Sequence, residues 1–401
     1  RLDRTAIMLD RRLGSRALIV VFIFLVSAAR SEQPPAAENA APALPKVKVF
    51  ILAGQSNMEG HGQIRSLDML GKDPKHGKLL SLLKADDGSW KTRDDVTISW
   101  QAKNKKHGPL TVGWGYGDQE IGPELLFGAI VGEHFDEPVL LIKTAWGGKD
   151  VYCDFRSPAA GKPTDADAAM LERQAADGQE RKVGHFYRQM ISEIEQCLAN
   201  IDDVVPGYQG QGYELAGMAW FQGWNDFCQW HVQVDGERIG DQLIANYSKN
   251  LAAMFQDVRK DLKAPDLPIA IGEMGVGGHE MAARAKKNPD DGEAMAMMNF
   301  RKAQQAVADD PALERVYFVP TSDYWDVRLQ ELRRISDDWW NEKREKGIED
   351  TEQNHLPTPA LNQEFESRGG HWYCHYNGSA SNYSLVGYAL AEMLLKEKPQ
   401  Q

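Results

Sequence analysis

The sequence predicts an α/β fold in which helices cover both faces of one mostly parallel β-sheet. Five short segments are runs of largely apolar, often β-branched residues, as expected of parallel strands that are buried on both faces. Longer segments with apolar residues at helical spacing separate them. Strands that alternate with helices favour a three-layer α/β/α arrangement around a five-stranded, mostly parallel sheet.

The predicted strands follow the apolar runs, and the predicted helices fill the intervals between them. Strands are expected over residues 47–53, 139–144, 216–221, 267–271 and 315–320. Helices are expected over residues 187–201, 242–262, 299–308 and 381–396, of which the first two repeat apolar residues at intervals of three and four. Right-handed crossovers place the carboxyl ends of all five strands at the same edge of the sheet.

Two regions interrupt this alternation. Residues 68–114 are polar and rich in Gly and Lys, and residues 337–370 are charged and contain Pro357 and Pro359. We interpret both as surface insertions in a single domain that spans residues 46–398. They either shape a substrate groove near the active face or are loops without a role in binding.

The N-terminus has the pattern of a secretory signal. Closely spaced arginines precede an apolar run at residues 17–26, which is too short for a typical membrane span, and small residues follow at 27–29. We expect a signal peptide over residues 1–29 that starts at Met8, with an uncleaved anchor as the alternative. Residues 30–45 are rich in Pro and Ala and are expected to be a disordered linker. The domain is then secreted, periplasmic or on the cell surface, without stable membrane insertion after cleavage.

The composition favours a globular protein that does not bind nucleic acid. Of the 401 residues, 42% are hydrophobic and 11 are Trp, which is enough for a substantial core. The formal net charge of −12 argues against nucleic acid as a partner, because phosphate binding needs clustered Lys and Arg. No cysteine has zinc-site spacing, so no structural metal is expected, and three disulfide pairings are open to Cys153, Cys197, Cys228 and Cys374.

Polar, glycine-rich turns follow three of the predicted strands. After the first strand, residues 54–58 read Gly-Gln-Ser-Asn-Met and present Ser56 at the edge where open α/β sheets bind ligands. A serine on a rigid turn is a candidate nucleophile, although an ordinary turn also fits this motif alone. After the second strand, Gly147 and Gly148 let the backbone approach a ligand. After the third, residues 222–226 contain two side-chain amides that are candidate hydrogen-bond donors.

Together with residues 371–379, these turns resemble the conserved blocks of a known superfamily. Residues 371–379 read His-Trp-Tyr-Cys-His-Tyr-Asn-Gly-Ser and precede the final predicted helix. The four blocks, in this order, resemble those of the SGNH hydrolases, and more closely the sialate O-acetylesterase-like group related to carbohydrate esterase family 6. The resemblance extends from about residue 46 to residue 395, and it implies the flavodoxin-like α/β/α fold of that superfamily.

The resemblance implies a serine esterase that removes O-acetyl groups from a carbohydrate. Ser56 would form an acetyl-enzyme, and His375 would act as the base. Backbone N–H groups and one side-chain amide would bind the oxyanion, and the candidates for these donors are Ser56, Gly147, Gly148, Asn225 and Gln222. No metal or organic cofactor is expected. The sugar is left open among sialic acid, xylan and other acetylated glycans.

One position departs from the pattern of the superfamily. The acid that orients the histidine usually lies three residues before it, and this chain has Trp372 there. Either His375 acts without a carboxylate, supported by a backbone carbonyl, or the acid comes from elsewhere. Asp326 is the first candidate, because it follows the fifth strand and so opens onto the same face, and Asp323 is the second.

Further side chains near the strand ends are candidates for binding the sugar, and they are Gln55, Asn57, Trp146, Trp224 and Trp372. The aromatic ones are equally expected as ordinary core residues. His371 is expected to pack or hydrogen-bond, and Asp226 either to cap a helix or to support Ser56 or Asn225. Two other functions stay open: a catalytically silent carbohydrate-binding protein, which the missing acid favours, and an SGNH lipase or acyl-esterase.

Overall fold

The computed structural model describes residues 44–347 and 356–396, which belong to one compact unit. The expected signal peptide and nearly all of the expected linker lie outside the described residues. Among the described helices, none is long and apolar enough to cross a membrane.

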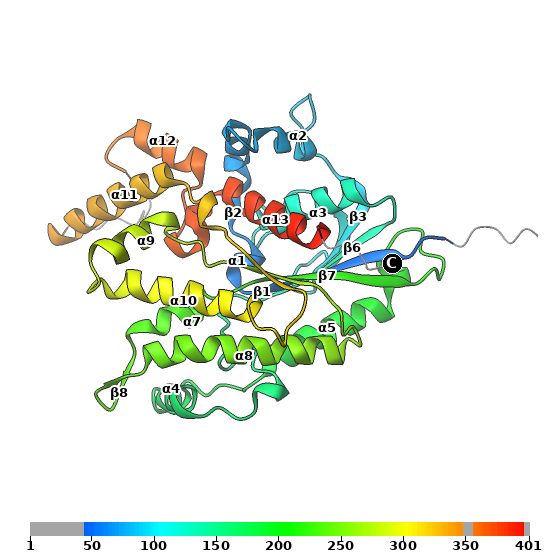
Figure 1. Ribbon diagram of the computed structural model, residues 1–401. Coiled ribbons are helices and arrows are strands. Elements are labelled where there is room, and N and C mark those ends of the chain that lie inside the picture. The colour runs from blue at the N-terminus through cyan, green and yellow to red at the C-terminus, as the bar shows by residue number, and fades with distance from the viewer. Residues whose placement is uncertain (1–43, 348–355, 397–401) are drawn as a thin grey trace, which may run out of the picture. The chain divides into compact units, whose positions relative to one another are not determined.

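The centre of the unit is a seven-stranded sheet with the strand order β11-β10-β7-β1-β6-β3-β4 (Figure 1). All five predicted strands are confirmed and are parallel to one another: β1 (Val47–Gly54), β6 (Val139–Ala145), β7 (Tyr213–Phe221), β10 (Ile269–Gly272) and β11 (Val316–Val319). Their central members are almost wholly buried, which explains their continuous apolar runs.

The sheet has two strands more than the five predicted, and both lie in the region interpreted as an insertion. β3 (Arg93–Ser99) pairs parallel with β6, and β4 (His107–Leu110) pairs antiparallel with β3 at the edge. In β3 only Val96 and Ile98 are apolar, and both are fully buried. Such a short alternation among charged residues is a weak signal for a strand, so the sequence alone suggested a polar insertion.

Helices cover both faces of the sheet. On one face lie α3 (Glu124–His134) and α13 (Ala380–Leu395), and on the other α5 (His185–Ala199), α8 (Gly240–Asp261) and α10 (Gly292–Ala308) (Figure 1). The four predicted helices are confirmed, although α10 begins seven residues earlier than the expected 299. Asp291 accounts for this start, because its side chain caps the helix by accepting a hydrogen bond from the Ala294 N–H.

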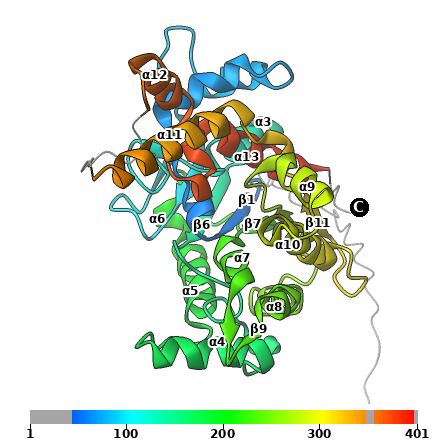
Figure 2. The same ribbon diagram turned by 90° about the vertical axis from the view of Figure 1, so that its left-hand side faces the viewer.

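The remaining elements are shorter or lie outside these layers. The α-helices among them are α1 (Ser56–Glu59), α2 (Leu80–Leu83), α4 (Asp165–Ala176), α6 (Ile201–Val204), α7 (Trp224–Phe227), α9 (Gly278–Lys287), α11 (Val327–Glu345) and α12 (Pro359–Arg368). Two small two-stranded sheets pair β2 (Gly62–Gln63) with β5 (Glu120–Ile121) and β8 (Gln233–Val234) with β9 (Glu237–Arg238). α11, which extends into the second predicted insertion, and α12, which lies within it, are beside each other (Figure 2) and share a small apolar cluster around Leu332 and Phe365.

The register of β1 brings three turns to one level. Gly54, the last residue of β1, pairs with Ala145 of β6 on one side and with Phe221 of β7 on the other. A side chain at Gly54 has no room, because a Cβ atom there would lie 2.2 Å from the Phe221 carbonyl oxygen. The parallel strands β6 and β7 lie on opposite sides of β1, so the carboxyl end of β1 is the switch point where α/β folds form a ligand crevice.

A buried ion pair between Lys143 and Glu124 connects the strand β6 beside this crevice to α3. The Lys143 ammonium lies 2.9 Å from the Glu124 carboxylate and also donates to the carbonyls of Glu59 and Trp114. It lies 4.3 Å from the centre of the Trp100 ring. Burial lowers the pKa of Lys143, and the Glu124 carboxylate opposes that shift. One side chain therefore joins β6, α3, the end of α1 and the segment before β5.

We predict that Lys143→Met lowers the free energy of unfolding by about 3–5 kcal/mol, because it leaves the Glu124 carboxylate buried without its cation. Urea denaturation followed by circular dichroism measures the change. The matched control is Lys346→Met, which removes a largely exposed partner of Glu342 and should leave the unfolding midpoint nearly unchanged. Equal midpoints for both variants would show that the buried pair is dispensable.

Candidate active site

Ser56 stands at the centre of the crevice, where β1 ends. It is the first residue of the short helix α1, and its side chain is largely buried. The first N–H groups of a helix have no partner within it, so the backbone N–H of Ser56 is available to a ligand. No described residue accepts a hydrogen bond from it.

Gln55 connects the turn after β1 with the turn after β7. Its Nε2 donates to Asn225 Oδ1 at 2.7 Å, and its Oε1 accepts from the N–H groups of Gly223 at 3.0 Å and Asn225 at 3.3 Å. The side chain is completely buried. The prediction that Gln55 binds substrate is therefore wrong, because all its polar atoms face the protein. Its effect is to orient the Asn225 amide, whose occupied oxygen leaves Nδ2 free to donate elsewhere.

Asn225 Nδ2 points toward Gly148. It lies 4.0 Å from the place that a Cβ atom on Gly148 would take, and a Cβ atom on the neighbouring Gly147 would lie 3.8 Å from the Cβ of Ser56. Within the described part of the chain, neither Asn225 Nδ2 nor the Gly148 N–H has an acceptor. Three donors without partners thus surround the serine: two backbone N–H groups and one side-chain amide. Such an arrangement is suited to a developing oxyanion.

The structure gives two of the predicted oxyanion donors polar neighbours within the protein. Gly147 lies beside the Glu59 carboxylate, because a Cβ atom on Gly147 would lie 3.0 Å from Glu59 Oε2. Burial raises the pKa of Glu59, and the nearby His61, Lys143 and Gly147 N–H oppose the rise. The Gln222 amide donates both to the Lys149 carbonyl and to Asp226, and its oxygen accepts from the Tyr247 hydroxyl. Gln222 therefore shapes the site without offering a free donor, and Gly147 lies on the side of the site next to a carboxylate.

Asp226 supports the loop that contains Gly148. Its carboxylate accepts from the Val151 N–H at 3.0 Å and from Gln222, while Gly223 takes the N-cap position of α7. Neither predicted role of Asp226, as helix cap or as partner of Ser56 or Asn225, is what the structure shows. Burial, together with the nearby Asp150 carboxylate, raises the pKa of Asp226 well above its ordinary value.

Asn57 joins the serine turn to the segment of His375. Its Nδ2 donates to the Cys374 carbonyl at 3.1 Å, and its Oδ1 accepts from the Tyr383 hydroxyl at 2.8 Å. The residue after Ser56 is thus bonded to the residue before His375, which brings the two onto adjacent segments. The prediction that Asn57 binds substrate is wrong for the same reason as for Gln55: the side chain is buried and fully bonded.

His375 lies in a stack of three imidazole rings. Its ring centre is 3.9 Å from that of His61 and 5.3 Å from that of His371, and the three rings are nearly parallel. Burial, and then repulsion by the other histidines, lowers the pKa of His375 to about 3. Burial and His61 lower the pKa of His371 to about 4. Both rings are therefore neutral at pH 7, as a general base must be.

Neither candidate acid reaches His375. Asp326 caps α11 through the Leu329 N–H and pairs with Arg368 at 3.0 Å, and Asp323 pairs with His279 at 2.6 Å near the surface. Both predictions are wrong because each carboxylate is held by other partners, although the segment of His375 does pack against α11. The Nδ1 atom of His375 is buried, and no described residue, backbone carbonyls included, forms a hydrogen bond with it.

The carboxylate nearest this stack is one that sequence reasoning missed. Glu120, on β5, faces His61 Nδ1 at 3.5 Å and is held by Gln63 and by the Gly117 N–H. Burial acts to raise the pKa of Glu120, but hydrogen bonds from His61 and Gly117 outweigh it and lower the pKa to about 2. The only sequence signal was the position of His61, five residues after Ser56.

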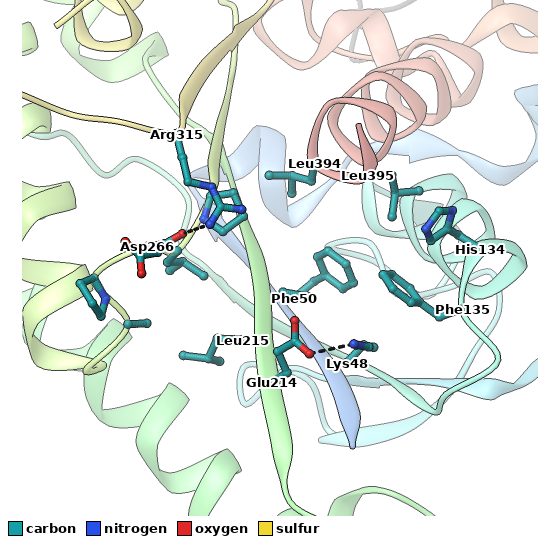
Figure 3. A pocket seen from close by; sticks show the side chains of 15 residues that line it. Lys48, Phe50, His134, Phe135, Glu214, Leu215, Asp266, Arg315, Leu394 and Leu395 are labelled. Carbon is teal, nitrogen blue, oxygen red and sulfur yellow. Dashed lines mark hydrogen bonds and ion pairs between the residues drawn. The ribbon is translucent and has the colours of Figure 1, made fainter. Parts of the chain in front are cut away.

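The aromatic candidates differ in exposure. Trp146 packs against Phe186 and is partly buried, and Trp224 packs against Phe227 and Tyr373. Trp372 is half exposed. Sugar stacking on any of these residues stays a prediction. A separate pocket lined by Lys48, Phe50 and Glu214 lies at the opposite, N-terminal ends of β1 and β7 (Figure 3) and contains none of these residues.

The sequence of residues 46–323 matches the model of one protein family, described as "Carbohydrate esterase, sialic acid-specific acetylesterase". This match covers more than two thirds of the chain and includes Ser56, Gly148 and Asn225, while His375 lies beyond it. The chain belongs to this family. It is therefore a carbohydrate esterase, and the recognition of an acetylesterase-like SGNH chain from its sequence is confirmed.

Solved structures of distant likeness include a protein of Arabidopsis thaliana (15% identity, TM-score 0.42, 88% of this chain and 99% of that one). Others are a carbohydrate acetylesterase from Xanthomonas citri (15%, 0.39, 70% and 51%) and a carbohydrate esterase family 2 enzyme with a carbohydrate-binding domain from Corynascus thermopiles (13%, 0.29, 70% and 58%). No curated protein matches the chain. The family match, and not these neighbours, identifies the class of enzyme.

We predict that Asp326→Ala and Asp323→Ala keep kcat on an aryl acetate within about twofold of the wild type, because neither carboxylate contacts His375. Asp326→Ala should still lower stability by roughly 1 kcal/mol through loss of the α11 cap. Steady-state kinetics and thermal unfolding separate the two effects. A large fall in kcat in one variant, without loss of fold, would show that this carboxylate does support His375.

Proposed function

We propose that this carbohydrate esterase is an exported serine enzyme that removes O-acetyl groups from a glycan through an acetyl-enzyme on Ser56. The observation that supports it most directly is the set of three unpartnered donors around Ser56, namely its own N–H, the Gly148 N–H and Asn225 Nδ2. Gly148 is exposed and Asn225 is partly buried, so water can reach these donors in the free enzyme and a substrate oxygen can take its place.

The reaction then proceeds in two steps. The Ser56 hydroxyl attacks the acetyl carbonyl as His375 takes its proton, and the oxyanion is held by the three donors. When the carbon–oxygen bond to the sugar breaks, His375 returns the proton to the departing sugar hydroxyl. Water then attacks the acetyl-enzyme, again with His375 as base, and releases acetate and free serine.

His375 acts in this proposal without a carboxylate partner. Packing replaces the orienting hydrogen bond: His61 stacks on one face of the ring, and the hydrogen bond from Asn57 holds the backbone at Cys374. The loop beyond the base adopts left-handed conformations at Tyr376 (φ 52°) and Asn377 (φ 50°) and is closed by a hydrogen bond from the Asn377 N–H to the Trp372 carbonyl. This tight loop fixes the backbone that follows the base.

The substrate that we propose is an acetylated carbohydrate. The name of the family makes an O-acetylated sialic acid the first glycan to test, with acetylated xylan next. Trp146, Trp224 and Trp372 are candidates for the stacking surface. Export rests on the signal-like N-terminus, which places the enzyme where secreted or cell-surface glycans occur.

We predict that Ser56→Ala abolishes hydrolysis of an aryl acetate and labelling by a fluorophosphonate probe, because both need the serine oxygen as nucleophile. Thermal unfolding should stay close to that of the wild type, since one buried hydroxyl is removed without a change of charge. Hydrolysis at the wild-type rate by the variant would refute the serine mechanism. Wild-type protein that binds glycan but neither reacts with the probe nor hydrolyses the ester would instead be a silent binding protein.

We predict that Gln55→Glu lowers kcat by roughly 10²–10³ with little change in KM, because it removes one oriented oxyanion donor. The N–H groups of Gly223 and Asn225 favour the ionised form of the new glutamate side chain. Its carboxylate has no donor for Asn225 Oδ1, so the Asn225 amide turns and Nδ2 donates to the carboxylate instead of to the oxyanion. Steady-state kinetics measures the split. The matched control, Gln196→Glu on the exposed face of α5, should keep both constants, and an equal kcat for the two variants would exclude this role of Gln55.

A further inference from the structure

The stack of three histidines at the base has a property that the esterase mechanism does not use. His61, His371 and His375 each offer one ring nitrogen, and these three atoms lie within 4.8 Å of one another. The residues come from two distant parts of the chain, and the esterase reaction needs only one of them as base. A cluster of three imidazoles is the ligand set of many zinc sites that keep a fourth position open.

Two further observations favour a ligand at this place. The Nδ1 atoms of His371 and His375 are buried and have no hydrogen-bond partner among the described residues, although buried polar atoms are rarely left unpaired. In addition, Glu120 contacts His61 Nδ1, so Nε2 is the nitrogen of His61 that remains for a metal. A carboxylate behind a ligating histidine is the usual second layer of a metal site.

Metal binding needs the three rings to rearrange from their present stack. Zinc–nitrogen bonds of 2.0–2.1 Å hold the ligand atoms of a tetrahedral site about 3.4 Å apart, so the widest pair has to close by about 1.4 Å. The rings, now nearly parallel, also have to turn so that each nitrogen directs its lone pair at the ion within its own ring plane. The backbone beside two of the ligands is held by hydrogen bonds from the His371 N–H to the Asn377 carbonyl and from the Asn377 N–H to the Trp372 carbonyl.

We propose that His61, His371 and His375 bind a divalent transition-metal ion of the zinc type, and that this ion reversibly inhibits the esterase. The inhibition rests on the proposed function: a metal on Nδ1 of His375 leaves the single ring proton on Nε2, which then has no lone pair to accept the proton of Ser56. The binding does not rest on it, since the three imidazoles are present whatever the reaction. Nitrogen ligands with an open fourth position favour Zn²⁺ over Ca²⁺ or Mg²⁺, which prefer oxygen.

The test measures Zn²⁺ binding and ester hydrolysis separately on the full chain. By isothermal titration at neutral pH, the wild type and Ser56→Ala should each bind one Zn²⁺ with the same affinity. His371→Gln and His61→Gln should bind it at least about tenfold more weakly, as expected for the loss of a ligand. His107→Gln, an exposed histidine on β4, is the matched control and should bind like the wild type.

In the hydrolysis experiment, Zn²⁺ should inhibit the wild type in proportion to its occupancy of the site, and EDTA should reverse the inhibition. The Zn²⁺ concentration that halves the metal-free rate should be at least about tenfold higher for His371→Gln than for the wild type. Unchanged affinity in both histidine variants would overturn the site. Full activity, or activation, at saturating Zn²⁺ would overturn the inhibition. Hydrolysis by Ser56→Ala would refute the serine mechanism, and the titrations would still decide the metal site.

Discussion

The parallel pairing of β1 with both of its neighbours is the constraint on which the crevice depends. Because Gly54 is level with Ala145 and Phe221, the turns that follow all three strands begin at one height. Ser56, Gly148 and Asn225 therefore meet although about 90 to 170 residues separate the later two from the first. Gln55 completes the alignment, since its amide joins the turn after β1 to the turn after β7 and sets the direction of the Asn225 side chain.

Buried polar groups hold the walls of the crevice. Lys143 connects the central sheet to α3 and to the end of α1, and Asp226 connects the turn after β7 to the loop beyond Gly148. Such groups cost desolvation, and they are tolerated here because almost every donor and acceptor has a partner. They also explain why several polar residues next to Ser56 are unavailable to a substrate. Gln55 and Asn57 lie at a strand end, which suggested substrate binding from the sequence, but their side chains position neighbouring segments instead.

The proposed base, His375, is the least conventional part of the site. It lies in a stack of imidazoles and not beside the expected carboxylate, and the low pKa values of His371 and His375 follow from burial among like groups. Burial in the stack keeps the His375 ring neutral, and the same closeness of three nitrogens supports the proposed metal site. Catalysis and inhibition by a metal would then share one residue, His375.

The sequence by itself determined the alternation of strands and helices and the five central strands, and it singled out Ser56 and His375 as candidates, because apolar runs, helical periodicity and short motifs are local properties of the chain. It did not show β3, whose apolar signal is two residues long, or the partners of the side chains in the site. Whether Gly147 or Gly148 lies beside the Asn225 amide, and whether Asp326 or His61 lies beside His375, was decided only by the tertiary structure. The physical reason is that these contacts join segments up to some 300 residues apart, and packing geometry, which no local pattern contains, selects them.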